Sequence, residues 1–141
     1  MWNGLLAEGC YENNSITLLS PDLLLPTEQY IEERVVQVAH EITQEGFWLH
    51  PILVERDSWV IMDGHHRREF ARRHLLRVVP CLMLDYSQVE LKSRQAGVDV
   101  TAHEIIRRGL QGRPYPPKTT RHTVCSSLTV KCRYALADLV R

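Results

Sequence analysis

The sequence has no hydrophobic run long enough to cross a membrane, for which roughly 18 or more apolar residues are needed. It also lacks the basic stretch that opens a secretory signal, because its first eight residues, MWNGLLAE, contain no Lys or Arg. Its four cysteines are widely scattered and none forms a Cys-x-x-Cys pair, which argues against a disulfide framework. These absences predict a reduced, cytoplasmic protein with no membrane partner.

Basic side chains are scarce in the first third of the chain. Residues 1–50 contain eight acids and a single base, Arg34, whereas six arginines lie between Arg56 and Arg77. The formal net charge is still +0. A cluster of arginines suits phosphate groups, either of a nucleic acid or of a small nucleotide, although a solvated helix face gives the same pattern.

The length of 141 residues, with 44% hydrophobic and 24% charged side chains, is typical of one globular domain, and we expect a single domain over 1–141. Apolar periodicity and turn residues predict a compact α+β architecture. Strands are expected at residues 15–19, 51–55, 58–62 and 78–84, helices at 28–45, 65–75 and from 101 to about 110, a loop at 118–122, and one further strand near 128–131. Thr27 is the expected N-cap of the first helix, and Gly46 its end.

The densest group of chemically active residues is the motif DGHHR at residues 63–67. It places an acid at the end of a strand, then a glycine turn, then basic side chains on the first turn of a helix. Free N–H groups and the helix dipole make such a turn a seat for anions. The motif therefore suggests phosphate binding, with Asp63 as a possible metal ligand; the alternative is a plain Asp-Gly turn before a solvated helix.

This motif, with the short helix and the strand VPCLM (79–83) that follow it, resembles the ParB/sulfiredoxin superfamily of nucleotide-binding domains. That superfamily includes chromosome-partitioning CTPases, sulfiredoxins and free L-serine kinases. PKTTRH at residues 117–122 is similar to a signature near the C-terminus of the kinases, and PTEQ at 26–29 to the segment that carries their catalytic glutamate. FWLHPIL at 47–53 resembles the lead-in to their first core strand. The resemblance covers roughly residues 16–123.

Three departures separate the groups within this superfamily. Sulfiredoxins carry a catalytic Cys where this chain has His65, and partitioning proteins need a helix-turn-helix module for which the roughly 55 residues after Tyr86 leave little room. The archaeal serine kinases have a long insertion before their Lys-Thr-Thr-Arg-His signature and a tryptophan where this chain has Arg94. The first two departures favour the kinases, and the third leaves the shape of the amino-acid site open.

The resemblance implies a small mixed sheet flanked by helices and a small-molecule kinase. Such an enzyme transfers a phosphoryl group from ATP or ADP, with Mg²⁺, to the hydroxyl of free L-serine or a close analogue, giving O-phosphoserine. It implies that Glu28 is the general base and that Asp63 binds Mg²⁺ or assists the hydroxyl. The nucleotide-binding residues that it implies are Gly64, His65, His66 and Arg67, and those for the amino acid and the transferring phosphate are Lys118, Thr119, Thr120, Arg121 and His122.

The alternative is a non-catalytic nucleotide-binding switch or DNA-associated module of the partitioning type. A pure switch needs neither Glu28 nor the motif at 117–122, so these residues favour the kinase, whose partners are an amino acid and a nucleotide rather than a nucleic acid. A nuclease would need more acidic metal ligands than Asp63 alone. The sequence fits ATP and ADP equally as donors, and serine, threonine and homoserine as acceptors, and it is silent on oligomeric state.

Overall fold

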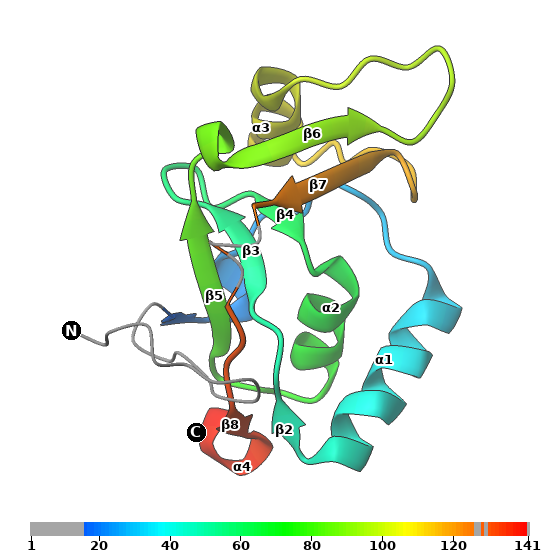
Figure 1. Cartoon of the computed structure of the whole chain (residues 1–141). Helices are drawn as coiled ribbons and strands as arrows, with labels where there is room; N and C mark the ends of the chain where they lie inside the picture. The colour runs from blue at the N-terminus through cyan, green and yellow to red at the C-terminus, as the bar shows by residue number, and fades with distance from the viewer. Residues whose placement is uncertain (1–15, 126–127, 129, 141) are drawn as a thin grey trace, which may run out of the picture.

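A computed structural model describes residues 16–125, 128 and 130–140 of the chain. Its centre is a four-stranded mixed sheet with the order β1–β5–β3–β4 (Figure 1). The strand β5 runs parallel to β3 and antiparallel to β1, and β3 is antiparallel to β4. The elements are β1 (Thr17–Leu19), η2 (Pro21–Leu23), α1 (Glu32–Glu45), β2 (Phe47–Trp48), β3 (Ile52–Glu55), β4 (Ile61–Asp63), α2 (His65–Arg73), β5 (Val79–Leu84), η3 (Tyr86–Gln88), β6 (Val89–Ser93), α3 (Ala102–Gln111), β7 (Thr120–Val124), β8 (Tyr134–Ala135) and α4 (Leu136–Leu139). The α+β class and the mixed sheet are as expected.

The central strand β5 contributes to two cores, because alternate side chains of a strand point to opposite faces. Val79 and Cys81 are fully buried in the larger core. Leu82 and Leu84 join a smaller cluster that packs against β6 and β7. The buried side chains of the larger core are Leu24, Trp48, Ile52, Val54, Ile61, Phe70, Ala71, Leu76, Val79, Cys81, Cys132 and Leu139. The strand predicted at residues 78–84 is therefore β5, one of the two inner strands of the sheet.

The helices α1 and α2 pack against each other, and α2 packs on β3 (Figure 1). The helix α1 ends at Gly46, whose φ of 80° is left-handed, as predicted. Its predicted start at residue 28 is wrong, since the helix begins at Glu32 and residues 28–31 are not helical. Thr27 does not cap the helix; its hydroxyl donates to the carbonyl oxygen of Ile61 at 2.8 Å. Backbone N–H groups of residues 27–29 are bonded to other parts of the chain, which holds this segment out of the helix.

The C-terminal third departs most from the expectation. The predicted loop at 118–122 is partly wrong, because β7 pairs with β6 in an antiparallel ribbon, with Ser93 opposite Thr120. The expected strand at 128–131 is absent from residues 128, 130 and 131, and residue 129 lies outside the described residues. Instead β8 pairs with β2. Ser15, expected in the first strand, also lies outside the described residues.

None of the helices in the described part of the chain has the length and apolarity needed to span a bilayer.

The helix α3 packs closely through Gly109 against Val60, which precedes β4, and Thr27 of the segment before α1. A Cβ at this position would lie 2.5 Å from Cγ1 of Val60 and 3.2 Å from Cγ2 of Thr27. We predict that Gly109→Ala lowers the free energy of unfolding by about 1–3 kcal/mol, because overpacking outweighs the better helix propensity of alanine. Urea unfolding measures this change, with the exposed Gln111→Ala on the same helix as control, expected within about 0.5 kcal/mol of wild type. A Gly109→Ala protein more stable than wild type would contradict this packing.

Candidate functional site

The centre of the site is an extended stretch of backbone, residues 27–31, called here the Glu28 segment. It pairs with Tyr115 on one side: the N–H of Gln29 donates to the carbonyl of Tyr115 at 2.8 Å, and the N–H of Tyr115 donates to the carbonyl of Thr27 at 2.8 Å. These bonds place the side chain of Glu28 between the start of α2 and the start of β7.

The carboxylate of Glu28 accepts three hydrogen bonds from residues about 90 positions away. One oxygen accepts the backbone N–H of Lys118 at 2.8 Å. The other accepts the N–H of Thr120 at 3.1 Å and its hydroxyl at 2.9 Å. The two motifs that were prominent in the sequence, PTEQ and PKTTRH, therefore meet directly at this carboxylate.

The two histidines of the DGHHR motif hold the Glu28 segment from the other side. Nε2 of His65 accepts the N–H groups of Thr27 at 3.0 Å and Glu28 at 3.2 Å. Nε2 of His66 accepts the N–H of Ile31 at 3.1 Å. Burial, together with the nearby His66, His122 and Arg68, lowers the pKa of His65 to about 3, and burial also lowers the pKa of His66. Both imidazoles are therefore neutral at pH 7.

The turn that precedes these histidines requires glycine. Gly64 has a φ of 116°, and a Cβ on it would lie 3.1 Å from the side chain of Ile52. It is also the N-cap of α2, so the first N–H groups of that helix have no partner within the helix. The structure thus forms the strand-turn-helix arrangement from which anion binding was predicted.

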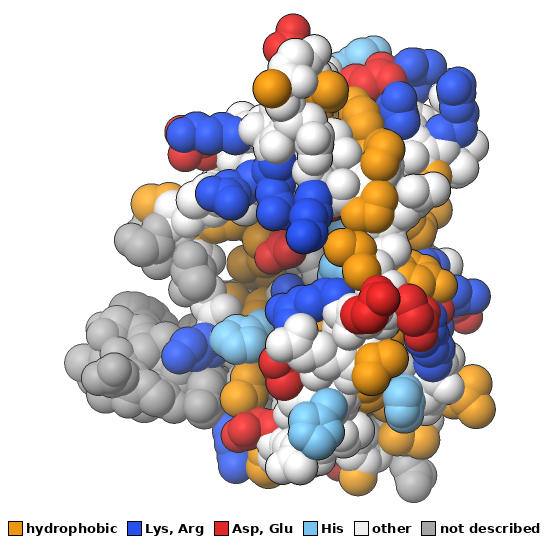
Figure 2. All heavy atoms as spheres, turned by 90° about the vertical axis from the view of Figure 1, so that its right-hand side faces the viewer, with side chains coloured by type: hydrophobic (Ala, Val, Ile, Leu, Met, Phe, Trp, Pro, Cys, Tyr) orange, Lys and Arg blue, Asp and Glu red, His pale blue; other side chains and the backbone are white. Residues whose placement is uncertain are grey.

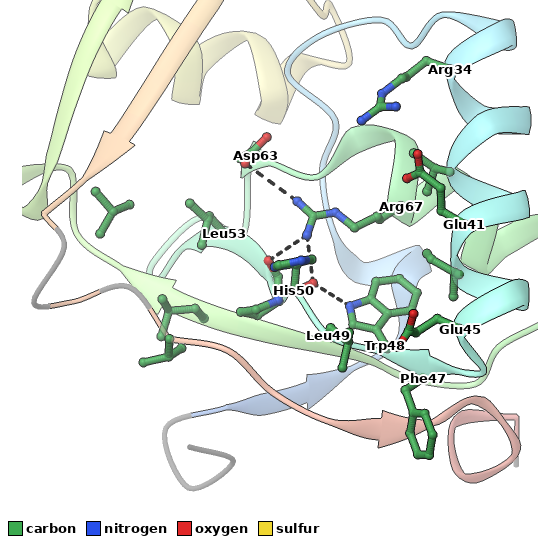
Figure 3. A pocket seen from close by; sticks show the side chains of 16 residues that line it. Arg34, Glu41, Glu45, Phe47, Trp48, Leu49, His50, Leu53, Asp63 and Arg67 are labelled. Atoms are coloured by element: carbon green, nitrogen blue, oxygen red, sulfur yellow. Dashed lines mark hydrogen bonds and ion pairs between the residues drawn. The ribbon is translucent and has the colours of Figure 1, made fainter. Parts of the chain in front are cut away.

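Arg67 is oriented inward rather than left free. Its Nη1 donates to the carbonyls of His50 at 2.8 Å and Pro51 at 3.4 Å, and its Nη2 lies 3.7 Å from Asp63 (Figure 3). Nε1 of Trp48 donates to the same His50 carbonyl at 2.7 Å. Burial lowers the pKa of Arg67, whose charge is nevertheless retained at pH 7. Arg67 thus stabilises the wall of the site. Its guanidinium is less available for binding a phosphate than the DGHHR motif suggested.

Two adjoining pockets open at these residues. The polar pocket, of about 380 Å³, is lined by Glu28, Gly64 and residues 120–122 among others. The apolar pocket, of about 600 Å³, lies between α1 and the β2–β3 connection (Figure 3). Four residues line both pockets: Arg34, Val38, Asp63 and Arg67. The apolar side chains around the second pocket include Ile42, Leu49, Leu53, Leu82 and Val124.

The polar pocket has an excess of positive charge. Arg34, Arg67, Arg94 and Arg121 line it, against only two carboxylates, those of Glu28 and Asp63. Figure 2 shows Lys and Arg side chains gathered around a hollow on this face. Within the described part of the chain, no hydrogen bond or ion pair holds the guanidinium groups of Arg34, Arg94 and Arg121. The pocket is therefore suited to a ligand with several negative charges.

His122 is paired with Tyr86, whose hydroxyl lies 2.9 Å from its Nε2. Burial lowers the pKa of His122 to about 4, and burial raises the pKa of Tyr86. The tyrosine therefore keeps its proton and the imidazole is neutral at pH 7, and the direction of the hydrogen bond between them depends on the tautomer of the ring. Nδ1 of His122 is buried without a hydrogen-bond partner among the described residues.

The predicted amino-acid-binding residues divide into two groups. Thr120, Arg121 and His122 line the polar pocket. The side chain of Lys118 is exposed, and its backbone has a left-handed φ of 61°. Thr119 is buried, and its hydroxyl donates to the carbonyl of Pro116 at 2.7 Å. Neither of these two lines the pocket, and both shape the turn that presents N–H groups to Glu28.

Sequence reasoning assigned no role to Arg34 or Arg94, and it placed Tyr86 only at the end of the central strand near the presumed cleft. Arg34 lines both pockets, and its isolation as the single base of residues 1–50 was the signal that could have found it. Arg94, noted as a departure from the kinases, lines the polar pocket. Tyr86 follows β5 directly and holds His122.

An acidic cluster lies apart from both pockets. Ligand atoms of Glu55, Asp57 and Asp85 come within 4.8 Å of one another, the spacing of a metal site. However, Glu55 already accepts the N–H groups of Asp57 and Ser58, and Asp85 pairs with Arg56 at 3.5 Å. None of these residues lines either pocket, so the cluster belongs to the turn after β3.

Comparisons with known proteins give several relatives, although no protein-family model matches the chain. A ParB-like protein of Sulfolobus acidocaldarius is 32% identical over 95 residues, which are 67% of this chain and 47% of that protein. An ATP-dependent L-serine kinase of Desulfurococcus mucosus is 32% identical over 103 residues, 66% of this chain and 40% of that protein. The chain thus spans less than half the length of these curated relatives.

Solved structures share the fold at lower identity. A free serine kinase in complex with AMP superposes with a TM-score of 0.78 at 15% identity, covering 94% of this chain and 97% of that chain. A conserved hypothetical protein from Pyrococcus furiosus gives a TM-score of 0.79 at 15% identity, covering 92% and 99%. The free serine kinase was also solved as variants in which one glutamate is replaced by alanine or glutamine. At this identity the likeness establishes the fold.

The buried neutral histidines predict acid-sensitive stability. In the unfolded chain their pKa returns to near 6.5, so between pH 6.5 and about 4 the unfolded state binds protons that the folded state does not. Stability is therefore complete above pH 6.5 and falls as the pH decreases, by up to about 1.4 kcal/mol per pH unit for each such histidine.

Urea unfolding at several pH values between 7 and 4.5 measures this slope. His122→Gln should reduce it, and the same change at the exposed His103 of α3 is the matched control. An unfolding free energy that stays constant or rises as the pH falls from 6.5 to 4.5 would contradict the buried neutral state.

Proposed function

Because this chain belongs to the ParB/sulfiredoxin superfamily and is homologous to proteins named ATP-dependent L-serine kinase, we propose that it is a small-molecule kinase. It transfers a phosphoryl group from ATP or ADP to the hydroxyl of free L-serine or a close analogue, giving O-phosphoserine. The observation that carries this proposal is the Glu28 carboxylate, held at the wall of a pocket that four arginines and a glycine turn make strongly positive.

The two pockets suit the two parts of a nucleotide. The apolar pocket is large enough and apolar enough for a base, and its rim carries polar groups from Glu41 and Glu45. Arg34 lies at the boundary of the pockets, where phosphates leading from the base toward Gly64 would pass (Figure 3). The free N–H groups at the start of α2 and the unpaired Arg34 would neutralise phosphate oxygens there.

The acceptor amino acid would bind at the wall formed by residues 120–122, across the polar pocket from the phosphates. The unpaired guanidinium of Arg121 can bind its carboxylate bidentately, with Thr120 and His122 on either side in sequence. This arrangement directs the hydroxyl toward Glu28, the glutamate that lines this pocket. Glu28 takes the hydroxyl proton as the oxygen attacks the phosphorus and the bond to the leaving nucleotide oxygen breaks.

Asp63 suits the Mg²⁺ that phosphoryl transfer uses. Mg²⁺ keeps several waters and is held by one or two carboxylates together with substrate phosphates. The side chain of Asp63 is 62% exposed and lines both pockets, next to the route assigned to the phosphates. When bound, the ion supplies charge neutralisation on the transferring phosphates. Arg67 keeps the Asp63 carboxylate near this position at a distance of 3.7 Å.

The proposal predicts net phosphoryl transfer to a free amino acid. Phosphorus NMR of the protein with ATP or ADP, Mg²⁺ and a panel of serine, threonine and homoserine should show a new phosphomonoester signal that depends on the amino acid. A protein that binds nucleotide but produces no such signal with any hydroxyl amino acid would contradict the kinase, and a nucleotide-binding switch would take its place.

Glu28→Gln tests the proposed base in the same assay. The rate should fall by about 10²–10⁴-fold, because glutamine cannot accept the hydroxyl proton. Serine binding should also weaken, because an amide NH₂ would face one of the N–H groups of Lys118 and Thr120. The matched control is Glu33→Gln, on the exposed first turn of α1. A Glu28→Gln rate within about threefold of the wild-type rate would show that Glu28 is not the general base.

A further inference from the structure

The Glu28 segment has an unusual set of hydrogen-bond acceptors. Of its backbone N–H groups, those of Thr27 and Glu28 donate to one imidazole, that of His65, and that of Ile31 donates to the imidazole of His66. The N–H of Gln29 donates to a backbone carbonyl, that of Tyr115. Two consecutive side chains of α2 therefore fix both ends of the segment.

The donors in these contacts settle which nitrogen carries the proton. A backbone N–H can only donate, so Nε2 of each histidine must be the acceptor and the single proton of the neutral ring lies on Nδ1. A second proton on Nε2 of His65 would face two N–H groups inside a buried site. His65 therefore cannot carry a positive charge to a phosphate without breaking its bonds to the Glu28 segment.

This arrangement bears on Glu28 because its backbone N–H is one of the two that His65 accepts, at 3.2 Å. The carboxylate of the same residue is bonded to Lys118 and Thr120. Loss of the His65 bonds would leave two part-buried N–H groups without these acceptors and release the backbone from which the carboxylate projects. A displacement of about 1 Å at a reacting group can cost about 10²-fold in rate.

We propose that His65 is a positioning residue, whose Nε2 accepts the N–H groups of Thr27 and Glu28 and so fixes the backbone of Glu28, and that it does not act as a phosphate ligand. The proposal rests on the kinase function for its kinetic consequence, whereas the bonds to Thr27 and Glu28 are independent of that function.

Two substitutions separate positioning from phosphate binding. Glutamine at residue 65 can place an acceptor oxygen near the position of Nε2, and asparagine can place a polar group only near that of Nδ1. Positioning predicts that His65→Gln keeps the turnover number within about tenfold of wild type. It predicts that the turnover number of His65→Asn falls by about 10²-fold or more. In both variants the nucleotide affinity, measured by calorimetry, should change less than threefold. The reverse order of the two variants, a parallel loss of rate in both, or a large loss of nucleotide affinity would overturn the proposal.

A spectroscopic measurement decides which nitrogen of His65 accepts hydrogen bonds, without any turnover. Long-range proton–nitrogen correlation spectra at pH 7.5 of wild-type protein labelled at histidine nitrogens should show His65 with a protonated Nδ1 and an unprotonated Nε2. A proton on Nε2 would overturn the proposal even if both variants fold poorly. Failure of the kinase function would instead appear as wild-type protein with the expected histidine signals and no phosphoryl transfer.

Discussion

The site depends on the hydrogen bonds between the Glu28 carboxylate and the N–H groups of Lys118 and Thr120. They join the segment before α1 to the turn before β7, about 90 residues later in the chain. On its other side the same segment is bonded to the first residues of α2 through His65 and His66. Three parts of the chain that share no local structure thus meet at one residue. Because hydrogen bonds that involve a charged group are roughly twice as strong as neutral ones, this junction fixes the pocket more firmly than apolar contact alone would.

Charge is distributed in the site so that each basic group has a distinct task. Arg67 is committed to backbone carbonyls and Asp63, and the histidines are neutral acceptors. Arg34, Arg94 and Arg121 provide positive charge that no carboxylate among the described residues pairs with. A chain with a formal net charge of +0 therefore concentrates a positive field in one pocket. This separation between residues that build the wall and residues that line the pocket suits the pocket to a ligand with several negative charges, as the proposed function requires.

Much of the fold follows from local sequence patterns, and the site follows from them only in part. The buried face of α1 carries Val35 and Val38, whose spacing of three is typical of an amphipathic helix, and the helix ends at Gly46 as predicted. The start of α1 was missed because the amides near Glu28 bond to a distant imidazole rather than to a helical turn.

The strands β6 and β7 were also missed, since polar side chains such as Glu90 and His122 occupy them and their pairing is a tertiary event. The resemblance brought the right motifs together, but the tasks of individual side chains depend on their bonds. The hydroxyl of Thr119 stabilises the turn before β7 and does not line the pocket. The accepting role of Nε2 of His65 follows from the N–H group of Thr27, which lies outside the DGHHR motif.

The most direct test of the site is a crystal structure of the wild-type protein with AMP and L-serine bound together. The account predicts the base of AMP in the apolar pocket, its phosphate near Arg34 and Gly64, and the serine hydroxyl within about 2.6–3.2 Å of a Glu28 oxygen. The serine carboxylate should lie on Arg121. A serine hydroxyl directed away from Glu28, or AMP bound outside both pockets, would contradict it.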